Sequence, residues 1–251
     1  EYYKNDKTFI IDVLTQATEL PSKADFERLF PQSLRFDRDI VLAFCQRDDF
    51  EKLYQDRHLY VPYTLTNDAE VMKHYVRKIQ RALQSCSEEL MDDPDVVRIA
   101  VLRDGLELQY ASRRLQEDEA MLRLACSNDG RALDFCPLGD VRHRLLSDRE
   151  FMKTVVSNKG GIMMRQVHES LRYDQELLHL ALGSGLEFRY VPAELQSDPQ
   201  FCEEAVAVKS EIYYQLDKKL QLLEPIAEAA VTAPDSTAGL MDNIAKQVKI
   251  F

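Results

Sequence analysis

The sequence predicts an all-α fold, a solenoid-like array of about eight short helical repeats of 24–31 residues each, followed by a C-terminal amphipathic tail helix. The first observation behind this prediction is a phrase that recurs eight times. It consists of a bulky apolar residue, two spacers, an aspartate, two more spacers and two apolar residues. The second observation is that each aspartate can begin a helix, and the third is that apolar residues follow it at helical spacing. One such unit cannot bury its own apolar face, so it must stack on its neighbours.

Each aspartate of the phrase is predicted to cap the N-terminus of a helix. Its carboxylate can accept hydrogen bonds from the free amides of the first turn, and Pro94 and Pro199 follow two of the aspartates at a position where proline is tolerated. A calcium-binding or catalytic role is disfavoured, because isolated carboxylates about 25 residues apart cannot supply the clustered oxygens of a calcium loop. The predicted caps are Asp6, Asp37, Asp68, Asp93, Asp118, Asp148, Asp174 and Asp198.

The residues after each aspartate predict an amphipathic helix of about ten residues. After Asp93 the apolar positions lie three, four, seven and eight residues on, which is one face of an α-helix. A glycine then follows at eleven or twelve, where a left-handed residue commonly ends a helix. These glycines are Gly105, Gly130, Gly160 and Gly185.

The stretch after this helix has an ambiguous pattern. Leu106, Leu108 and Tyr110 alternate as in a strand, whereas Leu108, Ala111 and Leu115 have helical spacing. We interpret the stretch as a second short helix, because most of its copies lack the β-branched residues that strands favour.

The repeats are expected to form one array over residues 1–220, with residues 1–65 divergent. A longer connection at 137–144 suggests a face for partners, and its predicted contacts are Arg142, His143 and Arg144. A terminal helix (221–232), a linker (233–239) and an amphipathic tail (240–251) follow. The apolar stripe of the tail is Leu240, Met241, Ile244, Val248 and Phe251. The tail has three interpretations: a cap over the last repeat, a docking segment for another protein and, least favoured, a membrane-surface helix.

Composition restricts the possible partners. A net charge of −11 disfavours general nucleic-acid binding. We interpret the local basic clusters as solvated helix faces or loops, and a functional one would meet an acidic patch on a partner protein. No apolar run approaches the 18 residues of a membrane-spanning helix. The five cysteines fall on predicted core positions rather than in a disulfide or metal pattern, which favours an intracellular, reducing compartment. The chain begins without methionine, so we expect a processed or trimmed N-terminus.

The sequence contains no recognisable catalytic motif. The histidines His58, His74, His143, His168 and His179 do not form a zinc pattern, and neither a phosphate-binding glycine loop nor a serine nucleophile elbow is present. The sequence therefore predicts no catalytic, cofactor-binding or metal-ligating residue.

Two segments carry a resemblance to a known family. Residues Asp93–Ser112, which read Asp-Pro-Asp-Val-Val-Arg-Ile-Ala-Val-Leu-Arg-Asp-Gly-Leu-Glu-Leu-Gln-Tyr-Ala-Ser, and residues Leu115–Cys126 resemble the repeats of domain-of-unknown-function family 4116. The resemblance is clearest over 90–126 and recognisable to about 220. It implies helical repeats and suggests interaction scaffolding, and it transfers no catalytic residue.

We therefore expect a non-enzymatic protein–protein interaction scaffold, for instance an accessory subunit of a larger assembly, that needs no cofactor. Any membrane contact would run through a partner or weakly through the tail. The alternative is a targeting or substrate-recruiting region of a larger enzyme or secreted effector. A repeat-based RNA binder is the third possibility, and it predicts RNA binding that depends steeply on salt.

Overall fold

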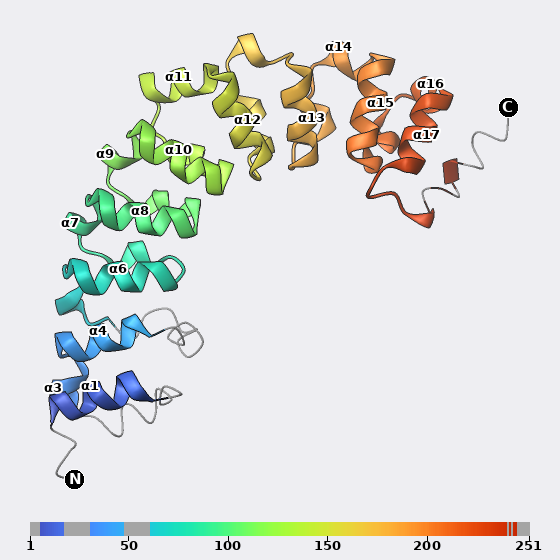
Figure 1. The fold of residues 1–251 in the computed structure, drawn as a ribbon. Coiled ribbons are helices and arrows are strands. Elements are labelled where there is room, and N and C mark those ends of the chain that lie inside the picture. Colours follow the sequence, from blue (N-terminus) through green and yellow to red (C-terminus); the bar gives the residue numbers. More distant parts are fainter. Residues whose placement is uncertain (1–5, 18–30, 48–60, 240, 242, 245–251) are drawn as a thin grey trace. The chain divides into compact units, whose positions relative to one another are not determined.

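Every regular element in the described part of the chain is an α-helix or a 3₁₀ helix, which confirms the predicted all-α class. The structure is a computed structural model that describes residues 6–17, 31–47, 61–239, 241 and 243–244 (Figure 1). The chain divides into two compact units, Glu1–Leu124 and Ala125–Phe251, and the division falls inside one helix, α10 (Glu119–Asn128).

The best-formed repeat consists of three helical pieces. A one-turn helix, α7 (Glu88–Met91), is followed by the ten-residue lead helix α8 (Pro94–Arg103) and then by the 3₁₀ helix η4 (Gly105–Tyr110). Ser87 caps α7 through its hydroxyl, which accepts a hydrogen bond from the Leu90 amide at 3.3 Å. The leucine that precedes each aspartate by three residues is therefore explained here, since it lies on this one-turn helix and is buried at Leu90.

The ambiguous second element is helical, as interpreted, but of the 3₁₀ type. Gly105, Leu108 and Ala111 are buried at intervals of three residues, which matches the three residues per turn of a 3₁₀ helix. That spacing lies between the period of a strand and that of an α-helix, so the sequence pattern fits neither well.

The lead helices stack in chain order within each unit (Figure 1). In the first unit α1 (Lys7–Gln16), α4 (Arg38–Gln46), α6 (Ala69–Lys78) and α8 pack successively. In the second unit α12 (Arg149–Ser157), α13 (Gln175–Gly183), α15 (Pro199–Val208) and α17 (Glu224–Thr232) do the same. This is the predicted array of stacked helical repeats.

Short elements connect the lead helices. In the first unit they are α3 (Gln32–Arg35), η2 (Tyr63–Leu65), η3 (Ala82–Ser85), α7, η4 and α9 (Arg113–Gln116). In the second unit they are η5 (Gly130–Phe135), α11 (Asp140–Ser147), η6 (Gly161–Gln166), η7 (Glu169–Leu171), η8 (Phe188–Tyr190), α14 (Ala193–Gln196), η9 (Ser210–Gln215) and α16 (Lys218–Gln221).

The core runs along the faces where lead helices meet. On α8 the predicted apolar positions Val96, Val97, Ala100 and Val101 are each at most 1% exposed. The corresponding side chains of α13 and α15 are buried in the same way. The register of the repeat phrase therefore places its apolar residues between stacked repeats.

The glycines after the lead helices do not share one role. Gly185 has φ +116° and ends α13 as a left-handed residue, with the Leu186 amide donating to the Ala181 carbonyl at 2.8 Å, as predicted. The left-handed prediction is wrong for Gly105, Gly130 and Gly160, since Gly185 is the only described glycine whose φ lies between +20° and +160°. Gly130 and Gly160 instead allow a close approach of backbones, because a Cβ at either one would lie within 2.3 Å of the Val155 carbonyl oxygen.

The repeat continues beyond the point where its phrase ends in the sequence. Helices α16 and α17 repeat the pairing of a one-turn helix and a lead helix, and α17 packs on α15. Leu223 occupies the capping position of α17 and makes no side-chain hydrogen bond there. The aspartate that marks the other repeats is missing, which hid this unit from the sequence pattern.

Candidate functional site

All eight aspartates of the repeat phrase cap a lead helix or α10. Asp93 Oδ1 accepts hydrogen bonds from the Asp95 amide at 2.8 Å and the Val96 amide at 3.3 Å. Each of the others accepts at least one amide in the same way, and the full set is Asp6, Asp37, Asp68, Asp93, Asp118, Asp148, Asp174 and Asp198. Their oxygens serve the protein backbone.

Several of these carboxylates also bind a cation from the preceding repeat. The residue directly after one aspartate pairs with the next aspartate along the array, as in Lys7 with Asp37 at 2.8 Å and Arg149 with Asp174 at 2.7 Å. Arg149 and Lys153 also contact Glu176, and their hydrogen bonds lower the pKa of that carboxyl to about 2. These ion pairs form a ladder between repeats that was not predicted, although the cation directly after the aspartate is a signal for it in the sequence.

The cysteines are buried and free, at Cys45, Cys86, Cys126, Cys136 and Cys202. Burial raises the pKa of the Cys45, Cys86 and Cys126 thiols to about 12 and that of Cys202 to about 11. A thiol with such a pKa is rarely a thiolate at neutral pH, so these four groups pack as small apolar side chains.

The buried carboxylate of Glu107 also has a structural partner. Glu107 lies on η4, is 3% exposed and accepts hydrogen bonds from the backbone amides of Arg81 and Leu83 at the start of η3. Burial raises its pKa, although the two amides oppose this shift. The carboxylate joins the 3₁₀ helices of two adjacent repeats.

The prediction that Arg142 contacts a partner is wrong. Arg142 is 6% exposed, and its guanidinium donates to the carbonyl oxygens of Leu133 and Cys136 and to the Gln166 side chain. It therefore closes the end of η5 inside the second unit. Its neighbours His143 and Arg144 are exposed, and the His143 ring meets the His168 ring edge-on at 5.3 Å between centroids.

Two of the predicted tail contacts lie in the described residues. Met241 is 39% exposed, whereas Ile244 is 3% exposed, so the partner-contact prediction is wrong for Ile244. Its apolar side chain is covered within the second unit, and the adjacent Asn243 side chain reaches the Tyr214 hydroxyl of η9 at 3.5 Å. Leu240, Val248 and Phe251 lie outside the described residues.

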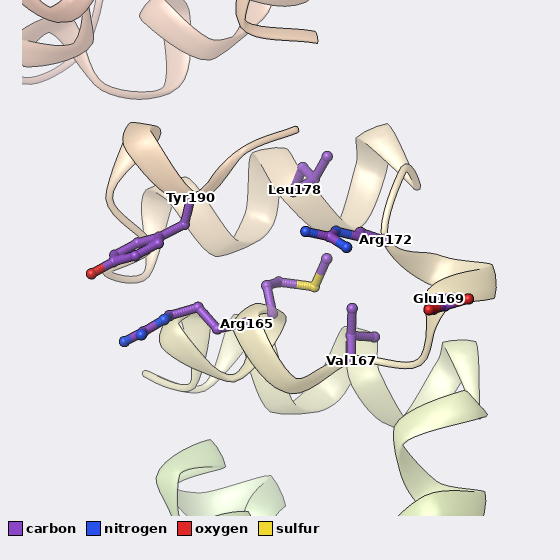
Figure 2. Close-up of a pocket in the computed structure, with 7 residues that line it drawn as sticks. Arg165, Val167, Glu169, Arg172, Leu178 and Tyr190 are labelled. Carbon is purple, nitrogen blue, oxygen red and sulfur yellow. The ribbon is translucent and has the colours of Figure 1, made fainter. Parts of the chain in front are cut away.

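The second unit contains a pocket of about 250 Å³ that the sequence did not indicate (Figure 2). It lies between the segment of η6 and η7 on one side and α13 with η8 on the other. Its lining residues, which we call the arginine–tyrosine pocket, are Met164, Arg165, Val167, Glu169, Arg172, Leu178 and Tyr190. Met164 and Leu178 are buried and provide an apolar floor.

The polar side chains of the arginine–tyrosine pocket lie at its rim. Figure 2 shows Tyr190 and Arg165 facing each other at one end of the pocket, with Glu169 at the other end. The Arg165 guanidinium carbon lies 4.3 Å from the centre of the Tyr190 ring, within cation–π distance. In the part of the chain that the structure describes, no carboxylate forms an ion pair with Arg165 or Arg172.

An exposed face adjoins the pocket. Leu138, in the long connection before α11, is 90% exposed, and His143 on α11 contacts His168. His168 sits between two lining residues of the pocket, Val167 and Glu169. The His143–His168 contact therefore links the helix that follows Leu138 to the segment that lines the pocket. We call Leu138, His143, His168 and the pocket rim together the insertion face.

Within the described residues, no group of three His, Cys, Asp or Glu side chains could hold a metal ion. None of the described helices combines the length and the apolarity that crossing a bilayer requires.

Comparison with known proteins finds one family. Two overlapping stretches, residues 68–116 and 93–140, match the family model described as Domain of unknown function (DUF4116), which confirms the resemblance. The matched residues include the repeats that begin at Asp68, Asp93 and Asp118. No curated protein and no solved structure matches the chain.

Proposed function

We propose that this protein is a non-enzymatic scaffold for protein–protein interaction, and that the insertion face of the second unit binds its partner. The observation that carries the proposal is that the second unit has both a 90% exposed leucine and a pocket whose two arginines have no carboxylate partner in the described residues. Exposed apolar side chains beside uncompensated charge are features of interaction surfaces.

The burial of potentially reactive groups supports the same proposal. Burial suppresses ionisation of the Cys45, Cys86 and Cys126 thiols, and the capping aspartates are engaged by backbone amides. Stacked repeats also present surface along their length, which suits a scaffold. An accessory subunit of a larger assembly is the form of scaffold that we favour.

Site-specific photocrosslinking tests the proposal. A photoreactive amino acid in place of Leu138 should crosslink the full chain to another protein in the source cells, and native mass spectrometry should find the same protein in the purified assembly. The matched control places the probe at Tyr63, which is 91% exposed in the first unit. Equal crosslinking from both positions, or a strictly monomeric protein with no crosslinked partner, would contradict the proposal.

A further inference from the structure

We propose that the arginine–tyrosine pocket recognises an acidic segment of a partner protein, in which carboxylates bind at Arg165 and Arg172 and a neighbouring apolar side chain packs on the pocket floor. This inference rests on the proposed function and names the chemistry of the partner. It starts from the charge of the rim, because two guanidiniums line one small pocket without a carboxylate of this chain paired to either in the described residues.

Neighbouring arginines show that this arrangement is a local exception. Arg149 contacts both Asp174 and Glu176, and Arg189, next to Tyr190, pairs with Glu187 at 2.8 Å. The chain as a whole carries 43 acidic and 32 basic residues, so carboxylates are abundant. Two arginines left without one at the same pocket provide charge complementarity for an external anion.

The cation–π contact prepares Arg165 for this role. Its guanidinium lies 4.3 Å from the Tyr190 ring centre, and this contact restrains an exposed side chain that would otherwise lose rotamer freedom on binding. Tyr190 is 37% exposed, so its ring also offers apolar area to the bound segment. Glu169 lies at the opposite end of the pocket and lines it without an ion pair to either arginine (Figure 2).

The floor and the size of the pocket select a side chain rather than a small molecule. Met164 and Leu178 are 6% and 2% exposed, and Val167 is half-buried beside them. The volume of about 250 Å³ is below the range of roughly 300–1,000 Å³ that small-molecule sites occupy. An acidic residue beside an apolar one meets both the rim and the floor.

A protein segment fits this site better than nucleic acid. The net charge of −11 repels an extended polyanion, and the short-range attraction of two arginines acts only over one pocket. A carboxylate next to an apolar side chain does not require a basic surface that extends beyond the pocket. RNA and phosphate are therefore the competing outcomes of the test.

Fluorescence anisotropy on the full chain provides the measurement. The probe is a short labelled peptide with the central sequence Glu-Glu-Leu-Glu-Glu, and the matched peptides carry Gln-Gln-Leu-Gln-Gln or Glu-Glu-Ser-Glu-Glu. The acidic-apolar peptide should bind best, and both matched peptides should bind at least about ten-fold more weakly, because each lacks one of the two contacts.

Variants test whether the named residues are responsible. Arg165→Ala and Arg172→Ala should each weaken binding of the acidic-apolar peptide at least about ten-fold. Arg113→Ala, which removes the same charge from an exposed helix of the other unit, should leave it unchanged. Arg172→Glu should reverse the preference toward a Lys-Lys-Leu-Lys-Lys peptide. Thermal melts of all variants should match the parent, since the three arginines are exposed.

The outcomes separate the inference from the proposed function. Equal binding by Arg172→Ala and Arg113→Ala would overturn the inference. The inference would also be overturned if inorganic phosphate, a phosphoserine peptide or a short RNA displaced the labelled peptide more strongly than the same peptide without its label does. If the natural partner stays bound to Arg172→Ala, the scaffold proposal survives without this pocket. If no partner is found by crosslinking at Leu138, the scaffold proposal fails whatever the peptide does.

Discussion

Replacing Gly130 by alanine should destabilise the second unit, because the added methyl group has no space. A Cβ at this position would lie 2.0 Å from the Val155 carbonyl oxygen and 2.8 Å from its carbon, where ordinary contacts begin at 3.4 Å. Both obstacles are backbone atoms of α12, so no side-chain rotation relieves the clash. The Gly130 amide also donates to the Asn158 carbonyl at 2.6 Å, and separating the two segments weakens that bond.

The magnitude follows from these two effects. Overpacking of a tight interior costs about 1–3 kcal/mol. Leaving a buried amide without its acceptor costs about 1–3 kcal/mol more. The loss of chain entropy in the unfolded alanine variant offsets about 0.4–1 kcal/mol. The free energy of unfolding of Gly130→Ala should therefore fall by about 1–6 kcal/mol.

Urea unfolding followed by circular dichroism measures this change, with Gly139→Ala as the matched control. A Cβ at Gly139 meets no atom within 4 Å, and its φ of 169° is open to any residue. Gly139 lies at the start of α11, where alanine is a poorer cap than glycine, so a loss below about 1 kcal/mol is expected there. If both variants unfold at the same urea concentration, the close approach of η5 to α12 is not as described.

Three further changes test the repeat register, the corrected arginine and the inter-repeat ladder. Val97→Asp should abolish stable folding of its repeat by burying an unpaired charge, whereas Asp93→Ala should cost about 0.5–2 kcal/mol in urea unfolding; equal small losses would refute the register. Arg142→Ala should lower the free energy of unfolding by about 2–4 kcal/mol, and His143→Ala, at an exposed residue, by less than about 1 kcal/mol. If thermal melts show the larger loss for His143→Ala, Arg142 is a surface residue after all. The pKa of Glu176 is depressed from 4.5 to about 2, so its contribution to stability is complete above pH 4.5 and lost as pH falls toward 2. In urea unfolding, the Glu176→Gln variant should be less stable than the parent at neutral pH and equally stable near pH 2. A stability difference that does not change with pH would exclude the ion pairs of Glu176 as the cause.

The short-range features of the repeat could be predicted because they depend on neighbours in the chain. Asp93 caps α8 through amides two and three residues away, and the apolar face of α8 follows from helical spacing alone. The helical character of the second element was also accessible, but its type was not. The spacing of Gly105, Leu108 and Ala111 becomes decisive only when their common burial is known.

The partner-contact predictions for Arg142 and Ile244 are wrong for the same physical reason. Arg142 stands in a basic cluster, and its side chain looks solvated until the carbonyls of Leu133 and Cys136 are seen to surround it. Ile244 belongs to the apolar stripe of the tail, and the sequence does not show what covers that stripe, whereas in the structure Ile244 is buried. In both cases the burial of a side chain is set by which segments lie beside it.

The sequence by itself determined that this chain is a stacked helical array with aspartate-capped repeats, because capping and amphipathic spacing act within a few residues. Only the tertiary structure decided where an interaction site could form. Arg165, Arg172 and Tyr190 are brought to one pocket by the packing of η6 and η7 against α13 and η8, and their lack of partner carboxylates depends on distances across that packing. Repeated local chemistry specifies the stack, whereas the arginine–tyrosine pocket arises from contacts between successive repeats, where the sequence varies from repeat to repeat.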